Sequence, residues 1–288
     1  MKLSGFNHLL LFFALIHTCA GEIRIAVSDL LAGYVTPPLK AYAQSENVDL
    51  DIESIGSLPA LDRLRSDEID LAVIAVPENQ EVPRDEFNIY PFAYDVAVVA
   101  VNDSNPLDEI TMSRLGGIFG GNEEFNFNTW GDLGLSGWGS RNIKPLVGTE
   151  QDSIALELFR YAVFSGSSLK SSVAMVLPRE VEDLLAADSA SIAILSRLPD
   201  SDDVKVLMIS SEENAPAFGP TKENIHYGDY PIRLSFYIAF DPRDQSKLKG
   251  ITRALLGDEI AENLSQNGLF SLPDTVRRRL LIDLDLED

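Results

Sequence analysis

The stretch that decides the fold is Asn128-Thr129-Trp130-Gly131-Asp132-Leu133, followed further along by Val147-Gly148-Thr149-Glu150-Gln151-Asp152-Ser153. The first part predicts a turn around Trp130. The second part predicts the end of a strand, a loop, and a helix over residues 153–164. Thr149-Glu150-Gln151-Asp152 fits a capping box, in which side chains at both ends of the run satisfy free N–H groups of the first helical turn. The stretch therefore predicts one strand–loop–helix unit.

Alternating strand and helix patterns on the N-terminal side of this stretch indicate α/β architecture. Apolar runs predict strands over residues 23–27, 50–55 and 69–76. The last run is nearly all apolar, which is typical of a strand buried on both faces. A helix is predicted over residues 31–43, where Pro37-Pro38 should kink or delay it. Another follows residue 56, with Ser57 placed as its N-cap.

The alternation continues through the rest of the chain. Helices are predicted over 113–119, 178–187 and 247–256, and strands over 96–101, 191–195 and 234–240. Parallel strands bring their C-terminal loops, and the helix N-termini that follow, to one edge of a sheet. Free N–H groups and the positive end of the helix dipole gather there, which suits an oxyanion.

Residues 1–20 have the features of a secretory signal. Lys2 supplies a positive start, residues 9–16 an apolar core, and Thr18-Cys19-Ala20 a small-residue cleavage site. We expect cleavage after Ala20 and a periplasmic or secreted protein. Lipidation of Cys19 is the alternative, although residues 16–18 match a lipobox poorly. No later segment is long and apolar enough to predict membrane insertion.

Composition excludes several kinds of chemistry. The only cysteine lies in the signal, so the remaining chain can form no disulfide and no thiolate metal site. His226 is the only histidine outside the signal, which leaves little material for a Ser-His-Asp triad or a histidine metal site. The formal net charge of −22 disfavours nucleic acid and anionic membrane surfaces as partners. We expect no metal and no cofactor.

Several motifs occur in order along the chain. They are Thr111-Met112-Ser113-Arg114-Leu115, Ile118-Phe119-Gly120-Gly121, Asn128–Leu133, Tyr230-Pro231 and Gly268–Pro273. In this order the chain resembles the phosphate-binding protein family that feeds ABC-type phosphate transporters. The resemblance implies an α/β, two-lobe periplasmic-binding-protein fold of type II, with a double crossover hinge and a ligand cleft. It places lobe 1 in residues 21–97 and 230–288 and lobe 2 in residues 98–229.

The resemblance also implies a ligand site between the lobes. Its candidate residues are Ser28, Asp29, Leu30, Ser57, Leu58, Asp152 and Ser153. The sequence departs from the family where Ala75 replaces an Asp, Thr149 an Arg and Ala155 a Thr. A buried charge-assisted hydrogen bond contributes roughly 1.5–3 kcal/mol, so losing several would cost many decades of affinity. We therefore expect a small oxyanion, phosphate or a related one, in a divergent site.

Structural roles explain some of these residues equally well. Ser57 can act only as a helix cap, and Ser153 can be an ordinary first-turn residue. The resemblance makes Trp130 a packing residue of its turn. Tyr94 and Asp95 could face the cleft, although packing at the hinge is the preferred interpretation.

Reversible binding by hinge closure, without bond chemistry, is the function that these observations predict. The partners would be a membrane permease or a sensor kinase, and the chain is expected to be a monomer. The alternative is a sensor or envelope interaction protein that reuses the fold and has lost phosphate binding. Ser167-Ser168-Leu169-Lys170 matches the Ser-x-x-Lys pattern of penicillin-recognising enzymes, but the companion motifs are missing. We therefore expect no enzyme.

Overall fold

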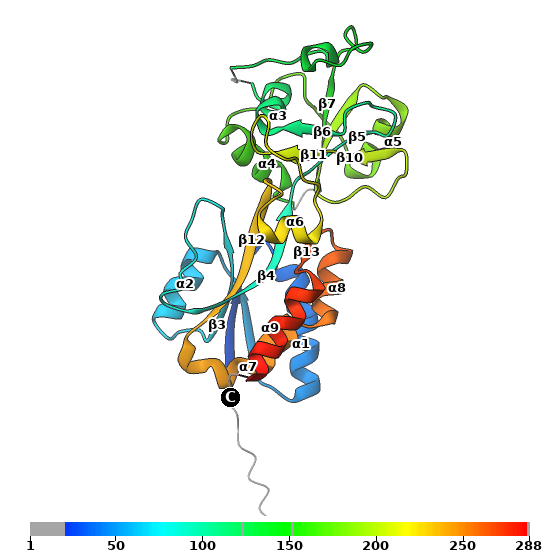
Figure 1. Ribbon diagram of the computed structural model, residues 1–288. Helices are drawn as coiled ribbons and strands as arrows, with labels where there is room; N and C mark the ends of the chain where they lie inside the picture. The colour runs from blue at the N-terminus through cyan, green and yellow to red at the C-terminus, as the bar shows by residue number, and fades with distance from the viewer. Residues whose placement is uncertain (1–20, 122–123, 151–152, 287–288) are drawn as a thin grey trace, which may run out of the picture.

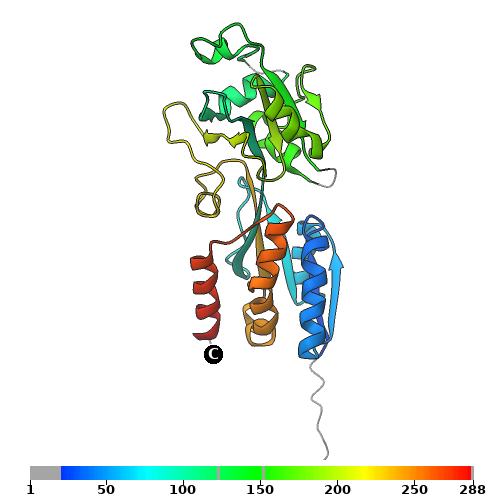
Figure 2. The ribbon, with the colours of Figure 1, turned by 90° about the vertical axis from the view of Figure 1, so that its right-hand side faces the viewer.

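The protein has two lobes joined by a narrow waist, as a computed structural model shows (Figure 1). The structure describes residues 21–121, 124–150 and 153–286. The predicted signal segment, residues 1–20, lies outside this range. Figure 2 shows the same two lobes in the perpendicular view, where thin strands and loops connect them. The α/β two-lobe fold predicted from the sequence is confirmed.

One lobe is built on a six-stranded sheet in the order β13-β4-β12-β3-β1-β2. Its strands are β1 (Ile23–Val27), β2 (Leu50–Ser54), β3 (Leu71–Val76), β4 (Asn88–Val96), β12 (Arg233–Phe240) and β13 (Phe270–Ser271). Its helices are α1 (Ala32–Glu46), α2 (Ser57–Arg65), α7 (Gln245–Leu255), α8 (Asp258–Gln266) and α9 (Asp274–Leu286), with the 3₁₀ turn η2 (Pro242–Asp244). Helix α2 covers one face of the sheet, and α1, α7, α8 and α9 lie on the other side (Figure 1).

The other lobe is built on a five-stranded sheet in the order β10-β5-β9-β7-β8, beside the pair β11-β6. Its strands are β5 (Val98–Asn102), β6 (Glu109–Thr111), β7 (Lys144–Gly148), β8 (Ala174–Met175), β9 (Ser191–Leu195), β10 (Val204–Val206) and β11 (Met208–Ser210). Its helices are α3 (Met112–Phe119), η1 (Trp130–Leu133), α4 (Ala155–Phe164) and α5 (Pro178–Ala187). Helix α6 (Lys222–Tyr227) lies at the waist (Figure 1).

Strand alternation sorts the apolar side chains of the first sheet into two cores. In β1 and β3, Ile25, Val27, Leu71 and Val73 join the main core, which extends through both lobes. The intervening residues, Ala26, Ala72, Ile74 and Val76, join a smaller core under α2. Successive side chains of a strand point to opposite faces, so an almost continuous apolar run fills both.

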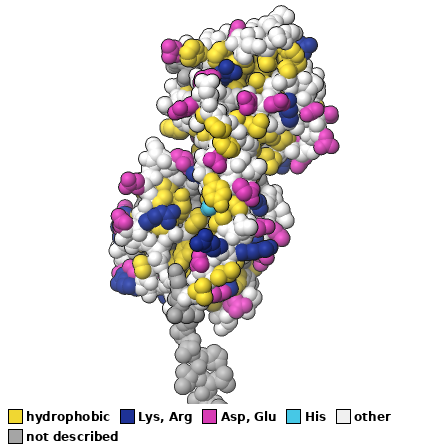
Figure 3. All heavy atoms as spheres, viewed as in Figure 1, with side chains coloured by type: hydrophobic (Ala, Val, Ile, Leu, Met, Phe, Trp, Pro, Cys, Tyr) yellow, Lys and Arg dark blue, Asp and Glu magenta, His cyan; other side chains and the backbone are white. Residues whose placement is uncertain are grey.

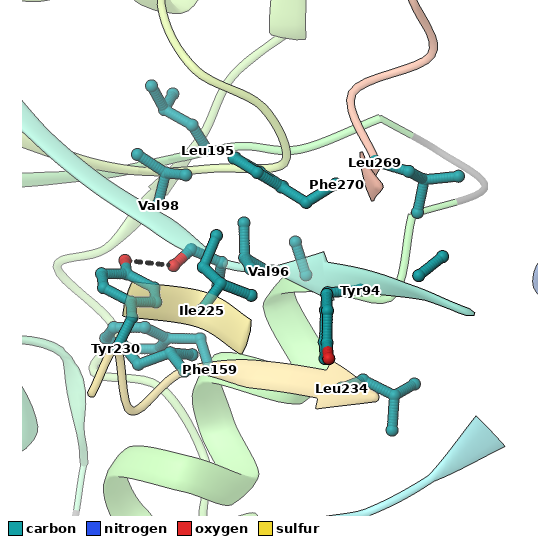
Figure 4. Packing of buried hydrophobic residues seen from close by; sticks show 14 of the residues in the cluster. Tyr94, Val96, Val98, Phe159, Leu195, Ile225, Tyr230, Leu234, Leu269 and Phe270 are labelled. Atoms are coloured by element: carbon teal, nitrogen blue, oxygen red, sulfur yellow. Dashed lines mark hydrogen bonds between the residues drawn. The ribbon is translucent and has the colours of Figure 1, made fainter. Parts of the chain in front are cut away.

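The chain crosses between the lobes along two strands. Strand β4 belongs to the first sheet and, after the single residue Ala97, continues as β5 of the second. The chain returns through Tyr230 and Ile232 into β12. Tyr230 Oη donates to Ala97 O at 2.7 Å, and Ala97 N donates to Ile232 O at 3.2 Å (Figure 4). The chain thus passes from one sheet to the other near residues 97/98 and 229/230, where we expected the lobe boundaries. We retain these boundaries as a proposal.

The Trp130 turn is a packing unit, as predicted. Thr129 is the N-cap of η1 and forms a capping box with Asp132. The indole ring is fully buried, and its Nε1 donates to Ala190 O at 3.1 Å. A buried tryptophan usually needs such a partner for its N–H group. The turn therefore anchors the loop before β7 to the loop before β9.

Four local predictions need correction. Helix α1 continues through Pro37-Pro38, because the carbonyl of Tyr34, which Pro38 cannot bond, accepts instead from Asn263 Nδ2. Gly56, rather than Ser57, is the N-cap of α2. The capping box predicted at Thr149 is wrong, because α4 begins only at Ala155 with Ile154 as N-cap. The strand predicted over residues 96–101 is divided, because Val96 ends β4 and β5 begins at Val98.

Both lobes carry a mixture of charges on their surfaces. Figure 3 shows acidic side chains spread over both lobes on one face and interspersed with basic ones. Among the described residues, no helix combines the length and the apolar character that a membrane span requires.

Candidate functional site

A cavity of about 330 Å³ lies between the lobes. Both lobes and the waist contribute to its wall. The lining residues are Leu30, Tyr34, Asp95, Glu150, Ser153, Ile154, Ser196, Arg197, Gln266, Asn267, Gly268 and Leu269. Apart from two leucines, an isoleucine and a glycine, these residues are polar or charged, so the cavity suits a polar ligand.

The first lobe supplies the start of helix α1. Ser28 O accepts the N–H groups of Leu31 and Ala32, which turns the chain from β1 into the helix. No side chain caps α1, and its first turn holds no acidic residue. Leu30 and Tyr34 bring this helix start to the cavity wall. The positive end of the helix dipole is therefore left without a counter-charge from the helix itself.

The second lobe supplies the start of helix α4. Its N-cap, Ile154, has no capping side chain, and Ser153 Oγ accepts from Ala155 N at 3.0 Å. Glu150 N donates to Ser196 Oγ at 3.3 Å, which ties the loop after β7 to the loop after β9. Strands β7 and β9 are parallel, so both loops leave the same edge of the sheet. This is the arrangement in which the sequence predicted an oxyanion site.

Of the residues that the structure describes, Arg197 is the only arginine or lysine in the cavity wall. It directly follows the β9–Ser196 segment and is exposed to solvent. Within the described part of the chain, its guanidinium has no ion pair and no side-chain hydrogen bond. A guanidinium offers five N–H donors in a fixed fork that fits oxyanions. Arg197 is therefore the best-placed donor in the cavity for an anionic group.

The two lobes approach each other closely beside Arg197 in the cavity wall. Gly268, in the loop between α8 and β13, has φ +81°, and a Cβ built on it would lie 3.1 Å from Arg197 Cβ. Only glycine adopts this backbone conformation without strain. The neighbours Gln266 and Asn267 extend the wall with side-chain amides, which both donate and accept hydrogen bonds.

Asp95 lines the cavity from the waist. Its side chain lies in β4, 9% of the residue is exposed, and Oδ1 accepts from Val96 N at 2.8 Å. Burial raises the pKa of the Asp95 carboxyl to about 6, although the hydrogen bond from Val96 acts in the opposite direction. Its neighbour Tyr94 instead packs at the hinge, where its hydroxyl lies 2.8 Å from His226 Nδ1. The prediction of hinge packing therefore describes Tyr94, whereas Asp95 also lines the cavity.

The structure separates the candidate residues chosen from the sequence. Leu30 and Ser153 line the cavity between the lobes. Asp29 is exposed beside it, whereas Ser28 is 1% exposed and lines neither this cavity nor the one described next. Asp152 lies outside the described residues.

Ser57 and Leu58 line a different cavity, of about 620 Å³, with Ala75 and residues 80–86 of the first lobe. Ser57 Oγ accepts from Ala75 N at 2.8 Å, which joins the start of α2 to β3. Accepting this bond leaves the hydroxyl hydrogen free to donate. Ser57 therefore has a structural partner in β3 rather than the helix-cap role that we weighed, and a role in ligand binding stays a prediction.

Arg197, Gln266 and Asn267 were missed from the sequence. A signal existed for Arg197, because it follows the predicted strand 191–195 and so belongs to the same sheet edge as the loop before α4. Gln266 and Asn267 carry no such signal, since they reach the cavity only through the packing of α8 against α1. The described residues contain no group of three or more His, Cys, Asp or Glu side chains that could hold a metal ion.

Comparison with known proteins agrees with this architecture. The sequence model described as the PBP superfamily domain matches residues 17–255. In structure the chain is similar to a possible phosphate binding protein from Planctomyces limnophilus, with a TM-score of 0.68 and 17% identity over 92% of this chain and 98% of the other. It is also similar to PstS from Borrelia burgdorferi, with a TM-score of 0.70 and 15% identity over 88% and 99% of the two chains.

A third similar structure is an ABC-type phosphate transport receptor from Vibrio cholerae, with a TM-score of 0.60 and 19% identity over 87% of this chain and 100% of that one. A search of curated proteins gave no significant match. Identities this low establish a shared fold and not a shared ligand. The family match, which covers most of the sequence, and the two-lobe structure agree: this chain belongs to the PBP superfamily domain family.

Proposed function

We propose that this protein is an exported solute-binding protein that reversibly holds a small oxyanion between its lobes, as the binding component of an ABC-type transporter. Cleavage after Ala20 would release it to the periplasm or the exterior as a monomer, with a membrane permease as its partner. No bond chemistry is involved. One observation carries the proposal: Arg197, without an ion pair in the described structure, lines a cavity whose wall also includes residues at the starts of α1 and α4.

Hinge closure follows from the connection between the lobes. Strands β4 and β12 cross the waist, and the cavity lies beside them with walls from both lobes. A small rotation about these strands would bring Leu30 of one lobe towards Ser153 of the other. Domain closure around a ligand by a few hinge residues is a common mechanism of two-lobe binding proteins.

The negative net charge is compatible with an anionic ligand. Exposed charges further apart than about 10 Å are largely screened at 0.1 M salt, whereas donors inside a cavity act at contact distance. The substitutions at Ala75, Thr149 and Ala155 nevertheless remove donors and an acceptor that the resembling family uses. We therefore expect inorganic phosphate itself to bind more weakly than micromolar.

Thermal unfolding with and without added oxyanions tests this function. Inorganic phosphate, sulfate and n-propylphosphonate at millimolar concentration should each be compared with chloride at equal ionic strength. At least one should raise Tm, because a ligand that binds only the folded state stabilises it by mass action. The Arg197→Ala variant should lose the increase. Arg278→Ala is the matched control, since Arg278 is exposed on α9 and does not line the cavity.

An increase that survives in Arg197→Ala would move the site elsewhere. The Ser57→Ala and Ser153→Ala double variant then asks whether the serines chosen from the sequence are responsible. If no oxyanion changes Tm of the native protein, the proposed function is wrong.

The alternative is a sensor or envelope interaction protein that has lost phosphate binding. The separation of Ser57 and Leu58 from the cavity between the lobes favours it, because the family's loops would no longer converge. Its partner would be a sensor kinase or another exported protein. Recovery of such a partner by the native protein, together with no oxyanion response, would support this alternative.

A further inference from the structure

The cavity between the lobes contains more negative than positive charge. Asp95 and Glu150 line it together with Arg197. None of these three side chains forms an ion pair with another described residue. Each carboxylate repels a simple dianion at short range, unless the anion is protonated and donates its O–H group. A positive group on the ligand would satisfy both carboxylates, so the charge pattern favours a ligand with a positive group as well as a negative one.

The buried carboxylate is the more informative of the two. Asp95 is more than nine-tenths buried, and the hydrogen bond that it accepts from Val96 N uses Oδ1. Carboxylates are rarely buried without a partner. The strands on either side, β12 and β13, place Leu234 opposite Asp95 and Phe270 opposite Tyr94, so neither supplies a cation there. Oδ2 is thus left to accept a hydrogen bond from something inside the cavity.

The volume of the cavity points the same way. A water molecule occupies roughly 30 Å³ in the liquid, so the five heavy atoms of a tetrahedral oxyanion take up at most about 150 Å³. The cavity holds about 330 Å³. The cavity therefore also has room for a ligand in which a chain of two or three atoms joins the oxyanion to a polar group.

The polar groups are also divided by origin. Arg197, Glu150 and the start of α4 belong to the second lobe, whereas Asp95 belongs to the waist strand β4. A ligand with two different ends can contact both at once. An anion that engages only Arg197 leaves the buried Asp95 carboxylate without a partner, which is costly.

We propose that the ligand of this cavity is a small zwitterion, with an oxyanionic group held by Arg197 and an ammonium group held by Asp95 and Glu150. This inference rests on the proposed function, because it assigns a ligand class to the same site. The ammonium donates to the free oxygen of Asp95, and the exposed Glu150 adds attraction from the rim. The oxyanion meets the guanidinium and the free N–H groups at the helix starts.

Paired ligands of equal size test the ammonium group. 2-Aminoethylphosphonate and n-propylphosphonate contain the same number of heavy atoms, and only the first has an ammonium in place of a methyl group. Calorimetric titration of the native protein at pH 7.5 should show tighter binding of 2-aminoethylphosphonate by about 10- to 100-fold, the gain expected for one charge-assisted hydrogen bond. Asp95→Asn should reduce this preference to a few-fold, and n-propylphosphonate should bind the variant as well as it binds the native protein or better.

Asp103→Asn is the matched control, because Asp103 is an exposed aspartate of the second lobe that does not line the cavity. It should keep the full preference. Equal affinity of the native protein for the two phosphonates would overturn the zwitterion proposal while supporting oxyanion binding. A preference that persists unchanged in Asp95→Asn would overturn the role of Asp95. If neither phosphonate, nor inorganic phosphate, nor sulfate binds, the proposed function itself is contradicted and the inference falls with it.

Discussion

The waist of the molecule and the cavity beside it differ in whether their polar side chains have partners. At the waist, Tyr230 donates to Ala97, Tyr94 pairs with His226, and the Arg233 side chain pairs with Glu78 at 2.8 Å. In the cavity, Arg197 has no ion pair within the described chain, and Asp95 is satisfied only in part. A satisfied polar network rigidifies a structure, whereas unsatisfied groups in a cavity are available to a ligand. The difference separates residues that hold the lobes together from residues that bind.

The largest expected loss of stability comes from disrupting the packing at the waist. Tyr230 is fully buried among apolar residues of both lobes (Figure 4). Replacing it by Ala removes the ring and the hydrogen bond to Ala97 O, and we expect the free energy of unfolding to fall by about 3–5 kcal/mol. Tyr230→Phe removes only the hydroxyl and should cost about 1–3 kcal/mol, because the buried carbonyl of Ala97 loses its partner. Chemical denaturation measures both.

A loss below about 1 kcal/mol in Tyr230→Ala would show that the waist does not hold the lobes, since a fully buried aromatic ring normally contributes several times more. The burial of Tyr230, which raises the pKa of its hydroxyl above the ordinary value, would then contribute little to the free energy of unfolding.

The next effect concerns pH. Asp95 has a pKa raised to about 6 in the folded protein by burial, against an ordinary value of 3.8. The folded state therefore binds the proton of the Asp95 carboxyl more tightly than the unfolded state does. Protonated Asp95 makes its full contribution to folding stability below about pH 4. That stability is lost as pH rises through 6. A tenfold difference in proton affinity corresponds to about 1.4 kcal/mol, so Asp95→Asn should stabilise the protein at pH 7.5 by up to about 3 kcal/mol.

The difference in stability between Asp95→Asn and the native protein should shrink steadily from pH 7 to pH 4. Comparing the two proteins at each pH cancels the titration of the other carboxyl groups. A difference that stays constant over this range would contradict the raised pKa. It would also weaken the view that the Asp95 carboxylate lacks a strong partner.

A smaller effect is expected at Gly268, which lies in the cavity wall next to Arg197. Gly268→Ala places a side chain where φ is +81°, which costs about 1–2 kcal/mol. The new Cβ would also press on Arg197 from 3.1 Å away. We expect Tm to fall slightly and oxyanion binding to weaken, since the guanidinium would shift. Gly134→Ala is a suitable control, because Gly134 has φ +85° but an added Cβ there meets nothing within 4 Å. It should lower Tm without changing binding.

The smallest effect on stability belongs to Arg197. Because this side chain forms no ion pair within the described structure, Arg197→Ala should change the free energy of unfolding by less than about 0.5 kcal/mol. A large loss of stability would place Arg197 among the structural residues of the waist, and the comparison would fail. Chemical denaturation without any added anion measures this change.

The sequence was sufficient for most of the fold because local patterns specify it. Strands Ile23–Val27 and Ser191–Leu195 and helix Pro178–Ala187 occur at the predicted residues. Strand β4 lies outside the predicted strands except for Val96, and it contains Pro91, which usually argues against a central strand. Its pairing with β12 changes register between Phe236 and Tyr237, opposite Pro91, and local sequence cannot reveal that.

The site was predictable only in part. Leu30 and Ser153 lie on loops that the strand–helix alternation brings to the sheet edges, so the sequence could place them. Asn267 enters the same cavity from the far end of the chain, through helix packing that no local pattern encodes. Ser57 has the right type for a ligand donor, and its hydroxyl hydrogen is not used in the bond from Ala75 N, yet it lines another cavity.

Calorimetric titration of 2-aminoethylphosphonate into the native protein and into Arg197→Ala, side by side at pH 7.5, tests the central claim most directly. The claim is that the charged groups without partners in the cavity form the binding site. We predict saturable one-to-one binding by the native protein and a loss of at least tenfold in affinity in the variant, whose stability should be unchanged. No binding by the native protein, or equal binding by both proteins, would contradict the claim.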